Sequence, residues 1–311
     1  MKRKVLCIAP PKVHLLDLNG PAHIFYEAKE YGADIELHFI STDNRSQVTS
    51  SAGLKFYELK SFSEFELTDQ DFIIAPGMAF SLLQNPEFLK ECIPFFKWLR
   101  SQNELGVTIC SICTGTFLLA ASGILAERSC TTHWKRIKAF KNAYPNIDIK
   151  ENRLFVADRN ILSSAGISSG IDLSLYILEK KFSTKLALDV AKEAVIYFRR
   201  GESDPQLSIF LKYRNHLDER IHQAQEFILK NMGQQFNQID IADHVNMSVR
   251  NLTRLFKQTT GITIHSYTAK LRIEHATNLI SKNNKLEMVA MECGFKSVSH
   301  LSKVLNGHDK K

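Results

Sequence analysis

The chain has 311 residues, of which 44% are hydrophobic, and it carries a formal net charge of +7. This length is too great for one small helical unit and predicts at least two domains with ordinary hydrophobic cores. No apolar run is long enough for a signal peptide or a membrane span, and the six cysteines match neither disulfide-framework nor zinc spacings, so we expect a cytoplasmic protein without a metal or a cofactor.

The first part of the chain alternates strands and helices. Apolar runs predict strands at 5–9, 35–41, 71–75 and 107–111, and helical spacing predicts helices at 20–31, 86–103 and 114–122. Such alternation predicts a flavodoxin-like α/β domain over residues 1–200, with a parallel sheet that helices cover on both faces. Binding sites in this architecture lie at the carboxyl ends of the strands.

One strand end carries a candidate nucleophile. The segment 106–115 passes from a strand directly into a helix of small residues and places Cys113 on a sharp turn. Such a nucleophile elbow exposes a thiol above a helix N-terminus, whose dipole lowers the pKa of the thiol. A buried cysteine in a tight turn would show the same sequence. Cys110 and Cys113 also form a C-x-x-C pair, which leaves a redox sensor as a further alternative.

The motifs around this turn resemble a known domain. The segments 15–21 and 75–78 follow predicted strands, 131–134 follows the elbow helix, and 164–173 lies further along the chain. Together with the elbow they are similar to the PfpI-like, class I glutamine amidotransferase-like domain of GlxA-type regulators, over about residues 4–200. The resemblance implies a ligand pocket, with backbone amides offered by the segment 75–78. We expect the pocket to consist of Asp17, Gly77, Met78, Cys113, Thr114 and His133.

Two functions remain open for this domain. Hydrolases of the superfamily pair the elbow cysteine with a histidine, but Thr114 follows Cys113 here, and His133 is the only histidine within a matching motif. We therefore expect a domain that binds a small molecule or mediates dimerisation, with a Cys113-dependent amidase or hydrolase as the alternative. The resemblance implies a nitrogenous metabolite, such as an amino-acid derivative, an amine or an amide. Asp17 would hydrogen-bond the thiol or a ligand, or else cap the helix starting near Gly20.

A polar break leads into the second domain. Residues 183–198 predict an amphipathic helix that closes the first domain, and residues 201–215 are expected to form an exposed linker. The second domain is expected to span 216–311 and to open with a helix at 216–231. Residues 215–311 hold 13 basic and 9 acidic residues, and this excess favours a polyanionic partner.

The last quarter contains two helix-turn-helix patterns joined by an amphipathic helix at 265–282. In the first pattern, Ser248 is the expected N-cap and Gly261 the C-terminal glycine of the second helix. The outward face of that helix consists of Val249, Arg250, Thr253, Arg254 and Lys257. In the second pattern, Gly294 permits a left-handed turn before a helix that presents Ser297, Ser299, His300 and Lys303. Side chains of these types suit base edges and phosphates in the major groove.

This arrangement resembles the DNA-binding unit of the AraC/XylS family of transcription regulators. The residues that carry the resemblance are 241–256, Leu271 to Ile273 with Ala276, and Ala290, Cys293, Gly294, Phe295 and Leu301. It implies that both recognition helices enter successive major grooves of double-stranded DNA, about 34 Å apart. The family usually continues beyond the position of Asn306, so the second motif is expected to be truncated. We thus predict a homodimeric transcription regulator.

Overall fold

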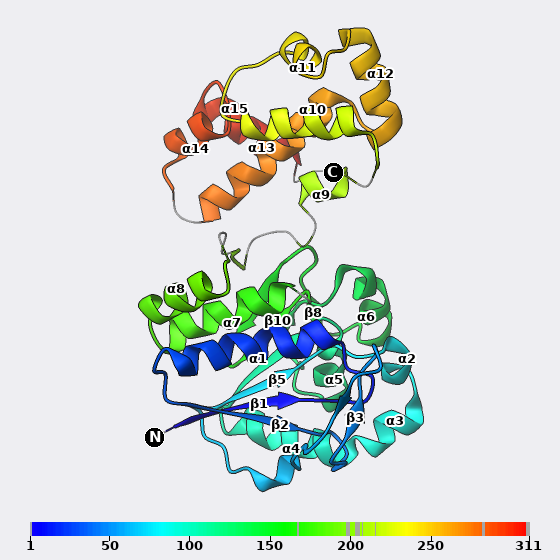
Figure 1. The fold of residues 1–311 in the computed structure, drawn as a ribbon, viewed down its shortest axis with the longest axis vertical. Coiled ribbons are helices and arrows are strands. Elements are labelled where there is room, and N and C mark those ends of the chain that lie inside the picture. The colour runs from blue at the N-terminus through cyan, green and yellow to red at the C-terminus, as the bar shows by residue number, and fades with distance from the viewer. Residues whose placement is uncertain are drawn as a thin grey trace. The chain divides into compact units, whose positions relative to one another are not determined.

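The computed structural model describes residues 2–166, 168–196, 200–202, 206, 208–214, 216–281 and 284–308. The chain divides into two compact units, Met1–Gln206 and Leu207–Lys311 (Figure 1). Within the described residues, no helix is both long enough and apolar enough to cross a membrane. Each unit is described by itself below.

A six-stranded sheet forms the centre of the first unit, in the strand order β2-β1-β5-β6-β10-β9. The parallel strands are β1 (Arg3–Ile8), β2 (Ile35–Ile40), β5 (Phe72–Ala75), β6 (Thr108–Ile112) and β10 (Ile161–Ser164). The edge strand β9 (Phe155–Asp158) pairs with β10 in the antiparallel sense. The strands β5 and β6 are buried throughout, as parallel strands are when helices cover both sheet faces.

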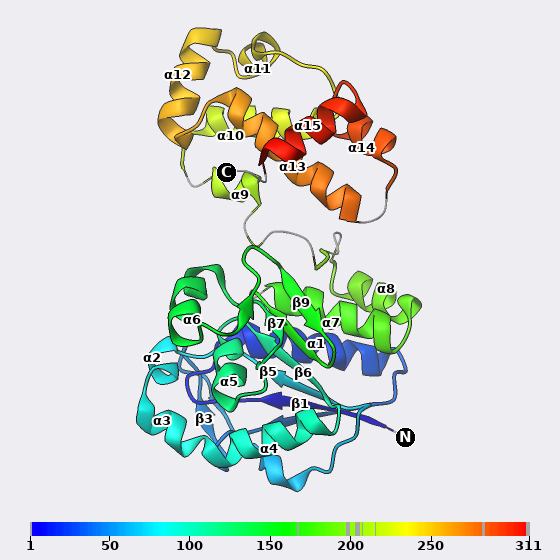
Figure 2. The same ribbon diagram turned by 180° about the vertical axis from the view of Figure 1, so that it is seen from behind.

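Helices cover both faces of this sheet (Figures 1 and 2). One core contains side chains of α1 (Leu15–Glu30), α7 (Ser168–Lys181) and α8 (Thr184–Glu193). The other contains side chains of α3 (Pro86–Glu91), α4 (Ile93–Glu104), α5 (Gly115–Ser122) and α6 (Ile137–Ala143). Alternate residues of β1 point to opposite faces, because Val5 and Cys7 join the first core and Leu6 and Ile8 join the second. The predicted parallel sheet with helices on both faces is confirmed.

Smaller elements complete the first unit. They are the two-stranded sheets β3 (Val48–Thr49) with β4 (Lys55–Phe56) and β7 (Ser129–Cys130) with β8 (Asp148–Ile149), the helix α2 (Phe80–Leu83), and the 3-10 helices η1 (Phe62–Glu64) and η2 (Trp134–Arg136).

Three predicted helix boundaries differ from the structure. The helix expected at 20–31 already begins at Leu15, so Pro21 lies in its interior and not at its start. The helix expected at 86–103 is divided at Cys92, because Pro94 stands in the first turn of α4, where proline is favoured. The helix expected at 183–198 ends at Glu193, and its predicted last residues, 197–198, lie outside the described residues.

The second unit contains two small cores that share one helix. The first core joins α10 (Glu219–Lys230), α11 (Gln238–His244) and α12 (Val249–Thr260) to the N-terminal half of α13 (Ile264–Ser281). The second joins α14 (Leu286–Glu292) and α15 (Val298–His308) to the C-terminal half of α13. The predicted helix ends at Gly261 and Gly294 are present, since both glycines have left-handed φ angles, of +79° and +69°.

The segment predicted as an exposed linker, 201–215, contains a short helix, α9 (Ile209–Lys212). Ile209 and Phe210 pack against the first core of the second unit, and the backbone amide of Ile209 donates to the carboxylate of Glu274 at 2.5 Å. Residues 208–214 therefore belong to the packed structure of the second unit, whereas the side chain of Gln206 donates to the carbonyl of Thr132 in the first unit at 3.0 Å. Because polar residues surround Ile209 and Phe210, the sequence pattern predicted an exposed linker here and not a packed helix.

Candidate ligand pocket and nucleic-acid interface

The turn after β6 holds Cys113 in an unusual backbone conformation. Its φ angle is +57°, a left-handed value that is uncommon for a residue with a side chain. The amide of Cys113 donates to the carbonyl of Ser164 at 3.0 Å, and its carbonyl accepts from the hydroxyl of Thr132 at 2.8 Å. These bonds to β10 and to the segment after β7 hold a strained turn in place. The sharp turn expected at this cysteine is therefore present.

The environment of the Cys113 thiol differs from the prediction. The residue is only 5% exposed, so the turn does not present the thiol to solvent. Burial and the negative charge of Asp17 raise the pKa of the thiol, whereas the amide of Thr114 and the charge of Arg136 lower it less strongly. Of the two alternatives for this turn, the exposed thiol with a lowered pKa is wrong, because desolvation outweighs the helix N-terminus, and the buried cysteine is the one present.

Two glycines allow other groups to approach this cysteine closely. At Gly166, which has a φ angle of +114°, an added Cβ would lie 2.4 Å from Cβ and 2.8 Å from Sγ of Cys113. At Gly77, an added Cβ would lie 2.3 Å from a carboxylate oxygen of Asp17 and 3.0 Å from Cβ of Cys113. Both positions therefore exclude any side chain while Asp17 and Cys113 keep their places.

The segment 75–78 does not offer the backbone amide of Met78 to a ligand. That amide donates to Oγ1 of Thr114 at 3.0 Å, and the same hydroxyl donates to the carbonyl of Met78 at 3.0 Å. Met78 is itself fully buried. The expected role of this amide as a ligand donor is wrong, because Thr114 already occupies it.

A pocket of about 390 Å³ opens in front of Cys113. Four of the six predicted pocket residues line it, namely Asp17, Cys113, Thr114 and His133, whereas Gly77 and Met78 lie behind its wall. The sequence reasoning missed the other lining residues, His14, Leu15, Leu16, Ala52, Phe80, Lys135 and Arg136. His14 is the N-cap residue of α1, and its ring reaches Asp17 in the first turn of the helix.

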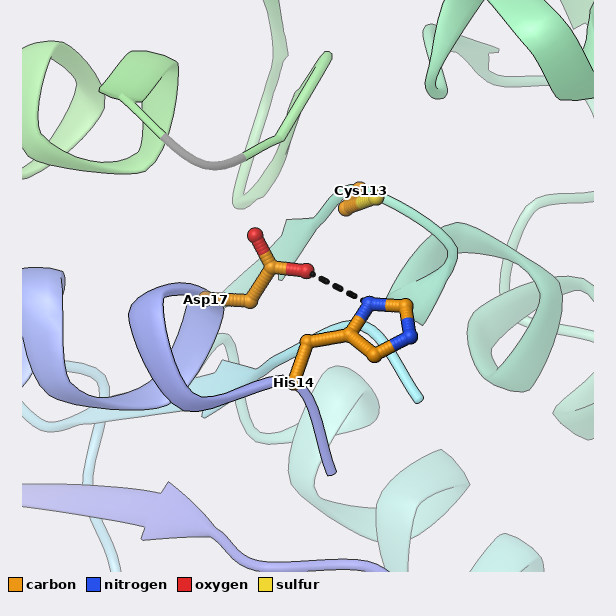
Figure 3. A group of neighbouring side chains, drawn as sticks. All are labelled: His14, Asp17 and Cys113. Carbon is orange, nitrogen blue, oxygen red and sulfur yellow. Dashed lines mark hydrogen bonds and ion pairs between the residues drawn. The ribbon is translucent and has the colours of Figure 1, made fainter. Parts of the chain in front are cut away.

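His14, Asp17 and Cys113 converge in this pocket (Figure 3). Nδ1 of His14 lies 3.2 Å from Oδ2 of Asp17, and the candidate donor atoms of the three residues all lie within 4.8 Å of one another. Asp17 is fully buried, while the side chain of His14 is 38% exposed. Asp17 therefore lies beside the thiol, and the alternative of a cap near Gly20 is wrong because α1 starts at Leu15.

His133 has the position of a structural histidine beside Trp134 and is not grouped with the thiol. Its Nδ1 accepts from the amide of Lys135 at 3.3 Å, and its ring stacks on Trp134 with a centroid distance of 5.7 Å. Burial and the charge of Lys135 lower the pKa of His133. His133 thus caps η2 at the rim of the pocket, and His14 is the histidine grouped with the thiol.

In the second unit, α12 presents a basic surface. Arg250, Arg254 and Lys257 are exposed, and their spacing of four and three residues places them on one face of the helix. Within the described residues, no ion pair or hydrogen bond engages their side chains. The other two predicted contact residues are half-buried: Val249 packs against the first core, and the hydroxyl of Thr253 donates to the carbonyl of Val249 at 2.9 Å. Only three of the five residues predicted to face outward on α12 are therefore exposed, namely Arg250, Arg254 and Lys257.

The helix α15 presents Ser299, His300 and Lys303, which are all exposed. The hydroxyl of Ser297 accepts from the amide of His300 at 3.1 Å and so caps the helix, and the ring of His300 packs edge-on against Phe295 at 5.5 Å. Of the four residues predicted to face DNA here, Ser297 therefore has a structural role.

A single arginine ties the two motifs together. Nε of Arg272 donates to the carbonyl of Met232 at 3.1 Å, and its Nη2 donates to the carbonyl of Gln234 at 2.9 Å. The side chain of Gln235 in turn donates to the carbonyl of Gly294 at 3.3 Å, in the turn of the second motif. The shared helix α13, about 27 Å long, and these bonds make one unit of the two motifs.

The chain belongs to a class of two-domain proteins. Its first domain is a parallel α/β domain with a strained cysteine turn, and its second is a tandem helix-turn-helix unit. Residues 3–180, more than half of the chain, match the DJ-1/PfpI family, and residues 241–308 match a helix-turn-helix domain. The chain belongs to the DJ-1/PfpI family.

Several known proteins are similar to this chain. HTH-type transcriptional regulator CdhR of Pseudomonas aeruginosa is 29% identical over 209 residues, which cover 67% of this chain and 62% of that protein. HTH-type transcriptional regulator GlxA of Rhizobium meliloti is 27% identical over 82% of this chain and 76% of that protein. Isonitrile hydratase of Pseudomonas putida is 30% identical over 55% of this chain and 68% of that enzyme. The match to CdhR thus spans less than two thirds of that relative.

The first unit also resembles solved structures. The crystal structure of an AraC family transcriptional regulator from Pseudomonas putida aligns with a TM-score of 0.53 at 20% identity, and the alignment covers 62% of this chain and 99% of that one. At this identity the likeness concerns the fold alone, and it agrees with the mostly parallel sheet described above.

Proposed function

We propose that this protein is a sequence-specific DNA-binding transcription regulator. The observation that carries the proposal is the exposed face of Arg250, Arg254 and Lys257 on the second helix of the first motif. Arginine donates two parallel hydrogen bonds to guanine edges and pairs with phosphates, so this face suits a major groove. The second motif, which α13 joins to the first, adds the exposed residues Ser299, His300 and Lys303 of α15 as a second face for contacts with DNA. The similarity to the regulators CdhR and GlxA supports the same role.

The first unit is proposed to control DNA binding through its pocket. The pocket is lined by the acidic side chain of Asp17, by the cations Lys135 and Arg136, and by the apolar side chains of Leu16 and Phe80. This mixture suits a small nitrogenous metabolite with both a charged nitrogen and an acceptor group. We further propose that the protein acts as a homodimer in the cytoplasm, with residues 1–200 as the ligand domain and 216–311 as the DNA-binding domain.

The test is binding of the full chain to its own promoter region by mobility shift, with competitor DNA. Arg250→Ala is expected to weaken selective binding by about 1 to 3 kcal/mol if the guanidinium contacts a base. Lys185→Ala removes an exposed cation from α8 of the first unit and serves as the control, which should bind as the wild type does. If the wild type and the Arg250→Ala variant both bind promoter and competitor DNA with equal affinity, the proposal is contradicted.

A second candidate function rests on the grouping of His14, Asp17 and Cys113. A thiol beside an imidazole and a carboxylate has the composition of a cysteine hydrolase site, and isonitrile hydratase is among the similar enzymes. The raised pKa of the Cys113 thiol and its burial weigh against a ready nucleophile. Assays of the purified chain with amides, compared with Cys113→Ala, separate the two functions, since Cys113-dependent turnover would favour the enzyme.

A further inference from the structure

The spacings of the cysteines in the sequence predicted no metal site, but the fold brings a thiol, an imidazole and a carboxylate together. We propose that His14, Asp17 and Cys113 bind one divalent transition-metal ion of borderline softness, with Zn²⁺ as the reference ion. The three donor atoms lie within 4.8 Å of one another. Edges of a tetrahedral zinc site with such ligands measure about 3.5 Å, so the donors must approach by about 1.3 Å at most.

The donor pair from the start of α1 already has this geometry. Nδ1 of His14 and Oδ2 of Asp17 are 3.2 Å apart, close to the edge of a tetrahedral site. His14 is the N-cap residue of α1 and Asp17 lies in the first turn of this helix, so the two side chains meet at the helix start. Binding of an ion would exchange their mutual contact for two bonds to the metal, with little movement of the backbone.

The third donor is held by its surroundings. The backbone of Cys113 is fixed by its bonds to Ser164 and Thr132, and Gly166 packs directly against its Cβ and Sγ. Gly77 limits the Asp17 carboxylate in the same way. Ligands that cannot turn away lose little conformational freedom when an ion binds, and this preorganisation favours binding.

The donor set selects the class of ion. One thiolate and one imidazole suit Zn²⁺ and its neighbours, whereas Ca²⁺ and Mg²⁺ require several oxygen donors. A divalent ion with one carboxylate, one thiolate and a neutral imidazole is electrically neutral as a group. This neutrality suits a site that has Lys135 and Arg136 along the same pocket.

The remaining position of the metal would face the pocket. His14 is partly exposed and three protein ligands leave one tetrahedral position for water or a small molecule from the 390 Å³ pocket. On binding, the S–H bond of Cys113 breaks, its proton passes to solvent, and sulfur forms the bond to the ion. No electron is transferred, so the step requires no oxidant or reductant.

Titration of the metal-depleted full chain with Co²⁺ tests the proposal, because a cobalt–thiolate bond gives a charge-transfer absorption in the near ultraviolet. We expect this band to saturate at one ion per chain and to disappear when Zn²⁺ is added. Cys113→Ala should abolish the band, and His14→Ala should weaken binding at least tenfold. Absence of the band in the wild type, or its persistence in folded Cys113→Ala, would overturn the proposal.

Matched controls separate the site from other thiols and histidines. Cys130→Ala removes a buried cysteine outside the cluster, and His23→Ala removes an exposed histidine further along α1. Both should keep the wild-type band, and its loss in Cys130→Ala would overturn the assignment to Cys113. If Cys113→Ala does not fold, the partly exposed His14 supplies the deciding variant, since unchanged cobalt affinity of His14→Ala contradicts the site. The proposal does not rest on DNA binding, because failure of selective DNA binding leaves the cobalt spectrum unaltered.

Discussion

At the scale of single residues, the decisive feature is the contrast between the backbone and the side chain of Cys113. The backbone adopts the strained turn that the sequence predicted, with a φ angle of +57°. The thiol, however, is buried beside Asp17, and both burial and this charge disfavour the thiolate. Local sequence predicts backbone turns better than the solvation of a side chain, because solvation depends on residues far along the chain.

The raised pKa of Cys113 predicts slow alkylation in the folded protein. The ordinary thiol pKa is 9.0, and a raised value leaves less thiolate at neutral pH, so the rate with iodoacetamide should be at least about tenfold below that of the urea-unfolded chain. The rate should still be rising between about pH 9 and pH 10, because the folded thiol titrates above its ordinary value. Mass spectrometry of the peptide that contains Cys113 measures both rates. A folded rate equal to the unfolded one would contradict the prediction.

The contact between Gly166 and Cys113 predicts a measurable loss of stability on substitution. Gly166→Ala and Gly123→Ala both place a side chain at a left-handed φ angle, but only at Gly166 would the new Cβ meet Cys113. Gly123→Ala should cost about 1 kcal/mol from the backbone alone. Gly166→Ala should cost about 1 to 3 kcal/mol more from overpacking. Urea unfolding of the two variants measures the difference, and equal losses would show that the clash is relieved at no cost.

At the scale of elements, the helix ends of the second unit follow the sequence closely. Ser248 caps α12 through a bond from the amide of Asn251 at 3.3 Å, and Gly261 ends the same helix with a φ angle of +79°. Caps are local interactions, so a few neighbouring residues determine them. The start of α1 was misplaced because Gly20 and Pro21 resemble a helix boundary, although packing of α1 on the sheet keeps the helix continuous through them.

The bonds of Arg272 predict that one side chain couples the two motifs. Arg272→Ala removes two charge-assisted bonds to the carbonyls of Met232 and Gln234 and should destabilise the second unit by about 2 to 3 kcal/mol. DNA affinity should fall as well, because the spacing of the two recognition helices depends on this link. Urea unfolding and mobility shift measure the two effects. Lys270→Ala, two residues earlier on α13, is the control, and equal effects of both variants would contradict the coupling.

At the scale of the whole molecule, the chain carries a net charge of +7, and its two units differ in the side chains that they expose. The sheet of the first unit places its pocket at the carboxyl ends of β1, β5 and β6, where the segments after these strands meet. The second unit presents basic helices on a scaffold of two small cores. The proposed ligand pocket and the proposed DNA-binding helices are thus separate in sequence.

The exposed cations of α12 predict a salt-dependent DNA affinity for the full chain. The logarithm of the association constant should fall linearly with the logarithm of salt concentration, because each neutralised phosphate releases counterions. Lys257→Ala should lower the magnitude of this slope by about 1 and weaken all sequences similarly. Lys185→Ala should keep the wild-type slope, since that residue lies in the first unit. Fluorescence anisotropy at several salt concentrations measures the slopes, and identical slopes for wild type and Lys257→Ala would rule out a phosphate contact.

The sequence by itself determined the alternation of strands and helices, the elbow at Cys113, and the caps and turns of both helix-turn-helix motifs. These features depend on hydrophobic periodicity and on neighbouring residues. Only the tertiary structure decided that His14 rather than His133 joins Asp17 and Cys113, that Thr114 occupies the amide of Met78, and that the thiol is buried. The physical reason is that burial, pKa and donor grouping arise where β1, β5 and β6 end side by side, and these strands are brought together by long-range packing.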